Sequence, residues 1–79
     1  MHTPLEAEVL ATAHIQHYIN SCECQSIEDV GNVLMKLLNI VGQALVGTQG
    51  KETAFVMIEK TTQSLKNEYS DEAGIHFVH

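Results

Sequence analysis

Apolar residues recur at helical spacing along this chain, most densely between Val30 and Val46 in the stretch VGNVLMKLLNIVGQALV. One continuous stripe steps by three or four residues and consists of Val30, Leu34, Leu37, Val41 and Leu45. Other apolar residues lie off that stripe, namely Val33, Leu38, Ile40 and Val46. Because a helix that is apolar around much of its circumference needs cover on several sides, we expect a buried helix here, around which the rest of the chain is organised.

A first helix is predicted at residues 4–21. Thr3 and Glu6 match the T-x-x-E pattern of a capping box, and Pro4 suits the first helical position. The apolar positions of this segment form one broad face and are Leu5, Val9, Leu10, Ala13, Ile15, Tyr18, Ile19 and Cys22. We expect this face to pack on the central helix.

The central helix is predicted at residues 27–46. Ser26 is its expected cap, with Asp29 in a weaker variant of the capping box, and Gly47 is its expected stop. Gly31 and Gly42 lie inside the helix, where each costs about 1 kcal/mol relative to alanine. Two interpretations remain open: the glycines allow another helix to approach closely, or packing simply tolerates them.

A third helix is predicted at residues 49–67, with Thr48 as its cap. Its stripe consists of Ala54, Phe55, Ile58, Thr61 or Thr62, Leu65 and Tyr69. Short connections make consecutive helices antiparallel, so the pattern predicts an all-α fold, a three-helix antiparallel bundle over residues 1–69. Residues 70–79 form a short extended tail, whose last five residues would be an edge strand, an arm packed on the bundle or a partner, or a frayed end.

The length of the chain indicates that it associates. Its 79 residues make one domain with a marginal core, and its two cysteines, Cys22 and Cys24, lie too close together for an unstrained bridge. We therefore predict a homodimer, since Phe55 and Tyr18 are expected in the core and the flanks of the second and third helices remain apolar. The predicted interface residues are Val33, Met35, Leu38, Ile40, Val46 and Met57.

The charge balance narrows the choice of partner. Ten acidic residues stand against four lysines, and there is no arginine, which disfavours nucleic acid and acidic membrane surfaces and favours a basic protein. Residues 27–46 have the length of a membrane span, but six polar residues interrupt them, so we predict a soluble helix. With no secretory signal visible and two free cysteines, we expect a cytoplasmic protein.

One cluster has the chemistry of a metal site. His14, His17, Cys22 and Cys24 supply four ligands of the kind that zinc prefers. The C-x-C spacing is tighter than the common pattern, so the alternative is a core cysteine, a loop thiol and two surface histidines. A second metal site could be formed by His2, His76 and His79, but histidines at chain ends are more often solvated. We predict no cofactor.

Catalysis has little support in the sequence. Residues 47–51, GTQGK, lack the spacing of a phosphate-binding loop and fit a turn between helices better. No acid is placed to orient a serine–histidine pair. We therefore expect a non-enzymatic protein–protein interaction module, an adaptor or inhibitor of the kind that phages and plasmids encode. A metal-binding regulator and a small helix-turn-helix regulator are the alternatives.

Overall fold

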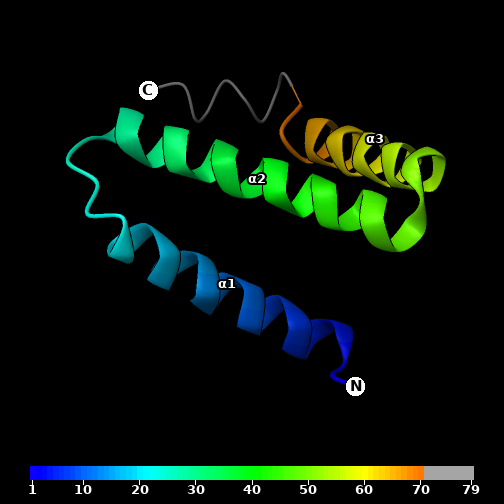
Figure 1. The fold of residues 1–79 in the computed structure, drawn as a ribbon, viewed down its shortest axis with the longest axis horizontal. Coiled ribbons are helices and arrows are strands. Elements are labelled where there is room, and N and C mark those ends of the chain that lie inside the picture. The colour runs from blue at the N-terminus through cyan, green and yellow to red at the C-terminus, as the bar shows by residue number, and fades with distance from the viewer. Residues whose placement is uncertain (71–79) are drawn as a thin grey trace. The chain divides into compact units, whose positions relative to one another are not determined.

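The computed structural model describes residues 1–70, which form three α-helices and no strand (Figure 1). These helices are α1 (Pro4–Ser21), α2 (Ile27–Gln49) and α3 (Lys51–Glu68). The all-α prediction is confirmed for this part of the chain. The predictions made for residues 71–79, including the edge strand and the solvated His76 and His79, lie outside the described residues.

The capping box at the start of α1 has formed as predicted. The N–H of Thr3 donates to the Glu6 carboxylate at 2.7 Å, and the N–H of Glu6 donates to the Thr3 hydroxyl at 3.2 Å. The first of these bonds, followed by the hydroxyl of Thr3, lowers the pKa of Glu6. Two otherwise unpaired donors are thereby satisfied, which explains why α1 begins at Pro4.

The turn between α1 and α2 closes without a glycine. Glu23 follows the helix cap and adopts a positive φ of 53°, a conformation that glycine usually supplies. Ser26 then accepts a hydrogen bond from the N–H of Asp29 at 3.1 Å, while the Asp29 carboxylate accepts one from the N–H of Gln25 at 2.9 Å. The predicted variant of the capping box is therefore present, with Gln25 as the second donor.

The prediction that α2 stops at Gly47 is wrong. The helix continues through Gly47 and Thr48 to Gln49, and the Thr48 hydroxyl bonds back to the Ala44 carbonyl at 2.8 Å instead of capping α3. The break comes at Gly50, whose φ of 84° and ψ of 153° are accessible essentially to glycine alone. A single glycine therefore separates α2 from α3.

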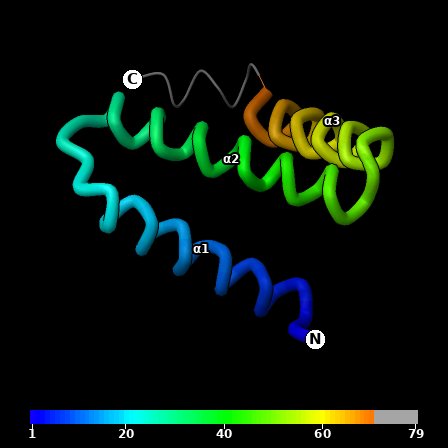
Figure 2. The backbone as a smooth tube through the Cα atoms, in the orientation of Figure 1, coloured from blue at the N-terminus to red at the C-terminus, as the bar shows by residue number. Residues whose placement is uncertain are grey.

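The chain divides into two compact units, and the boundary falls inside α2, between Asn39 and Ile40. The backbone tube in Figure 2 runs through this boundary as uninterrupted helix. The first unit contains α1 and the first half of α2. The second contains the rest of α2 and α3.

In the first unit, α1 and α2 pack loosely. The Tyr18 hydroxyl donates to the Val33 carbonyl at 2.7 Å, and Tyr18 and Ile19 are half-buried. On α2 the half-buried apolar residues share one face and are Val30, Val33, Leu34 and Leu37. No residue of α1 is fully buried, so the expected broad contact is limited to the carboxyl-terminal part of α1.

In the second unit, α3 lies against α2 near Gly42. A Cβ at Gly42 would meet the Ile58 side chain at 3.9 Å, an ordinary contact distance, and Leu45 is half-buried. Ala54 is the only fully buried residue among residues 1–70. Phe55, which was expected in the core, is 58% exposed, so that prediction is wrong for the single chain.

Candidate interaction surface

Helix α2 carries apolar residues that are exposed in the part of the chain that the structure describes. None of its residues is fully buried, so the prediction of a buried helix is wrong for the single chain. Met35 is 70% exposed and Leu38 is 67% exposed. With Gly31 they are spaced by four and three residues, and they share one side of the helix. We call Gly31, Met35 and Leu38 the α2 stripe.

Gly31 completes this stripe, although the apolar stripe predicted from the sequence did not include it. It is exposed, and a Cβ built on it would meet nothing within 4 Å. The spacing 31, 35, 38, 42 was the available signal in the sequence, because residues at these intervals share one side of a helix.

The six predicted interface residues have two kinds of environment. Val33 is half-buried, and its carbonyl accepts the hydrogen bond from Tyr18. The other five are exposed: Met35, Leu38, Ile40, Val46 and Met57. Because Ile40 follows Met35 by five residues, it lies on another side of α2. Their exposure leaves them available for contacts, and the interface itself stays a prediction.

A polar row runs along α2 beside these apolar residues. It steps by four, three and four residues and consists of Asn32, Lys36, Asn39 and Gln43. Residues at this spacing share a helix face, so α2 is amphipathic rather than uniformly apolar. One side of the helix is therefore suited to water and the remaining sides to apolar contacts.

The same helix is long and apolar enough to cross a membrane. This conclusion rests on its 23 residues and on a mean hydropathy of 1.4 in its most apolar window. Length and composition alone do not separate a span from the central helix of an assembly. The polar row distinguishes them in part, because a lipid-facing helix would expose that row to hydrocarbon.

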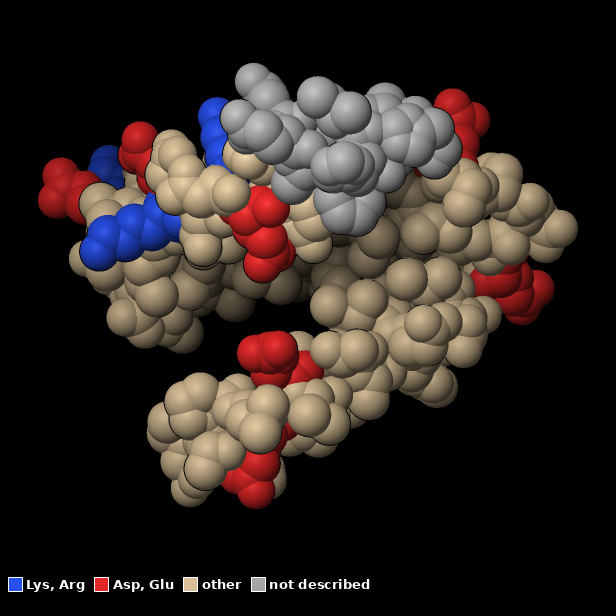
Figure 3. All heavy atoms as spheres, turned by 180° about the vertical axis from the view of Figure 1, so that it is seen from behind, with Lys and Arg blue, Asp and Glu red and all other residues tan. Residues whose placement is uncertain are grey.

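The acidic excess of the described chain is concentrated in the first unit. Residues 1–39 hold five acidic residues and one lysine, Lys36, whereas residues 40–70 hold three of each. No lysine occurs within α1, so all the charged groups coloured on that helix in Figure 3 are acidic. Within residues 1–70, the net negative charge therefore lies in the first unit.

The structure does not gather the predicted metal ligands into one site. Within residues 1–70, no group of three or more histidine, cysteine, aspartate or glutamate side chains is placed to hold a metal ion. His14 and His17 are exposed on α1. Cys22 is exposed at the end of α1, and the Cys24 thiol donates to the Ile19 carbonyl at 4.0 Å.

The turn between α1 and α2 instead places a tyrosine beside the two thiols. Partial burial, followed by the charge of Cys22, raises the pKa of Tyr18. Partial burial, followed by the charges of Cys22 and Asp29, raises the pKa of Cys24. Both shifts favour the neutral forms of Tyr18 and Cys24, which suits structural hydrogen bonding better than nucleophilic chemistry.

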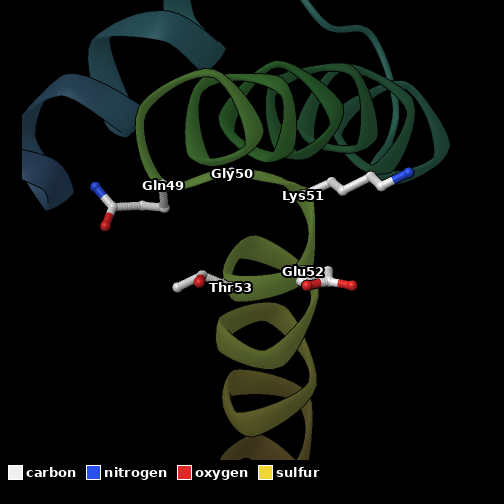
Figure 4. A pocket seen from close by; sticks show the side chains of 5 residues that line it. All are labelled: Gln49, Gly50, Lys51, Glu52 and Thr53. Carbon is white, nitrogen blue, oxygen red and sulfur yellow. The ribbon is translucent and has the colours of Figure 1, made fainter.

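The α2–α3 turn has a shallow depression of about 280 Å³ lined by residues 49–53. In Figure 4, Gln49 and Thr53 point to one side while Lys51 and Glu52 point to the other. Side chains that diverge in this way do not converge on a common ligand. This geometry fits the prediction that the segment is a turn between helices.

Comparison with known proteins identifies no relative: no family model matches the chain, and neither a curated protein nor a solved structure is significantly similar to it.

Proposed function

We propose that this protein is a non-catalytic interaction module: a small acidic helical homodimer that acts as an adaptor or inhibitor by binding a basic protein. The observation that carries the proposal is the exposure of Met35 and Leu38 on a helix with no fully buried residue. Large apolar side chains that are exposed next to one another on one side of a helix are typical of interaction sites. A single fully buried residue, Ala54, is also little core for residues 1–70 to fold around.

Self-association through the α2 stripe accounts for these features together. Two copies of α2 packed against each other would cover Met35 and Leu38, which are exposed in the single chain. The polar row, which contains Lys36 and Asn39, would remain in water. Gly31, which has no side chain, would let the second backbone approach closely. In this proposal, a second copy of the chain supplies the helix contacts that the predicted antiparallel bundle needs.

Sedimentation equilibrium on the wild type and on Leu38→Lys tests this proposal. We expect a dimer for the wild type and a monomer for the variant, because a lysine in an apolar interface loses water without gaining a partner. Circular dichroism on both proteins shows whether the variant keeps its helices. A wild type that stays monomeric at micromolar concentration contradicts the proposal, and so does a dimer that Leu38→Lys leaves intact.

A matched pair of glycine variants sharpens the test. Gly31 and Gly47 both lie within α2, both are exposed, and an added Cβ meets nothing within 4 Å at either position. We expect Gly31→Ala to weaken the dimer and Gly47→Ala to leave it unchanged. Equal dissociation constants for the two variants would exclude close approach at Gly31.

The alternatives stay predictions. No observation on residues 1–70 favours the metal-binding regulator, since the four proposed ligands are not gathered. The helix-turn-helix regulator would need a basic third helix, and α3 carries as many acidic residues as lysines.

A further inference from the structure

Within residues 1–70, the amino-terminal half of α1 has an apolar face that no other segment buries. Leu5 is 70% exposed and Val9 is 62% exposed, and Ala13 continues the same row at a spacing of four residues. The capping box holds this part of the helix in shape. Because the described part of the fold leaves these side chains exposed, their placement at helical spacing calls for an explanation beyond folding.

Carboxylates flank this face on both sides. A shallow depression of about 380 Å³ beside Val9 is lined by Leu5, Glu6 and Leu10 among others. A second, of about 360 Å³, is lined by Glu8, Val9, Thr12 and Ala13. Val9 therefore lies between Glu6 and Glu8, and we call Leu5, Glu6, Glu8, Val9 and Ala13 the α1 face.

We propose that the α1 face docks a cationic amphipathic helix of the partner protein, with the partner's apolar side chains on Leu5 and Val9 and its basic side chains beside Glu6 and Glu8. Helices commonly bind other proteins through apolar anchors spaced by three or four residues. Acidic flanks add attraction for a basic partner and set its register. This inference rests on the proposed function and identifies which part of the protein would meet the basic partner.

Charge distinguishes this occupant from a second copy of the chain. The first 35 residues contain five acidic residues and no lysine or arginine. Two α1 faces packed together would therefore place like charges opposite one another, at a cost that rises as water is excluded. Helix α3 is a poorer occupant than a basic helix, because its charges balance. The α1 face and the α2 stripe consequently have separate roles.

A pair of synthetic peptides tests the assignment. The first is an amphipathic helix of leucine and lysine, and the second keeps the leucine positions and replaces every lysine with glutamate. We expect the full-length protein to bind the lysine peptide, more weakly at high salt, and to bind the glutamate peptide at least about tenfold more weakly. Equal binding of both peptides would overturn the inference.

Two variants locate the peptide. The double variant Leu5→Gln/Val9→Gln keeps good helix-forming residues in α1, and we expect it to lose at least about tenfold in affinity for the lysine peptide while remaining a dimer. The matched control, Leu38→Gln in the α2 stripe, should weaken the dimer and retain peptide binding. Circular dichroism verifies that both variants remain helical. Unchanged peptide affinity in the helical double variant would overturn the assignment.

The outcomes separate this inference from self-association. If the wild type is a dimer but does not bind the lysine peptide, the assignment of the α1 face as a docking site is overturned. The proposed homodimer is not contradicted by that result. Binding of the wild type to neutral phosphatidylcholine vesicles, abolished in Leu5→Gln/Val9→Gln, would also overturn it, because the occupant would then be lipid. Loss of the dimer in Leu38→Gln with peptide binding retained supports both assignments.

Discussion

At the scale of single residues, Gly50 is the position where the backbone most restricts the choice of side chain. Its φ of 84° lies in a region that alanine enters only with strain. We expect Gly50→Ala to lower the free energy of unfolding by about 1–3 kcal/mol. Gly47→Ala should raise it by about 0.5–1 kcal/mol, because Gly47 is helical and has open space around it. Urea denaturation measures both, and changes of the same sign would contradict the assigned helix ends.

The two cysteines should differ in reactivity although a single residue separates them. Cys22 is exposed, whereas Cys24 is half-buried, and its pKa is raised by that burial. Since the thiolate is the reactive form, iodoacetamide at mildly alkaline pH should label Cys22 several-fold faster than Cys24. Fragment-ion mass spectrometry distinguishes the two positions. The rates should converge in urea, and equal rates in the folded protein would argue against the observed packing of the turn.

At the scale of secondary-structure elements, the start of α1 should depend on pH. The pKa of Glu6 is lowered by the Thr3 N–H, so its charged form stabilises the fold. This stabilisation is present above the ordinary pKa of a glutamate and is lost as the pH falls through the lowered value. We expect residues 4–10 to lose helical NMR shifts in that acidic range. Glu6→Gln should remove this dependence, and Glu8→Gln, the matched control two residues on, should retain it.

Removing the Thr3 hydroxyl, which completes the same capping box, should lower the free energy of unfolding. Thr3→Ala removes the acceptor of the Glu6 N–H and should destabilise the protein by about 1 kcal/mol. Thermal denaturation of the variant, compared with the wild type at the same protein concentration, measures the effect. A variant as stable as the wild type would mean that α1 contributes little to the cooperative unit.

The helix starts could be predicted from the sequence because their chemistry is local. Thr3 with Glu6, and Ser26 with Asp29, each satisfy backbone donors within one turn, and both caps are present. The end of α2 was predicted wrongly at Gly47, since Gly47 and Gly50 both suit a helix terminus. A helix can pass through one glycine at a cost of about 1 kcal/mol, so composition does not decide which glycine ends it.

Burial was predicted less well than helix position, because it depends on contacts distant in sequence. Of the stripe predicted on α2, four residues are half-buried, namely Val30, Leu34, Leu37 and Leu45, whereas Val41 is 46% exposed. The same spacing placed Phe55 in the core and Leu5 and Val9 on α2, yet all three are exposed. Periodicity identifies an apolar face, but it does not say whether the same chain or another molecule covers that face. The proposed interaction surfaces come from this difference.

At the scale of the whole molecule, stability should depend on protein concentration. Only Ala54 is fully buried among residues 1–70, so the chain by itself gains little from the hydrophobic effect. If association supplies the missing burial, unfolding is coupled to dissociation. Each tenfold rise in concentration should then raise the thermal midpoint by about 3–6 °C for a domain of this size. Circular dichroism melts over a hundredfold concentration range measure this slope, with Leu38→Lys as the control that should melt at a lower, concentration-independent temperature. A wild-type midpoint that does not move with concentration would mean that a single chain folds with the small core observed, and the apolar side of α2 would then need a different explanation.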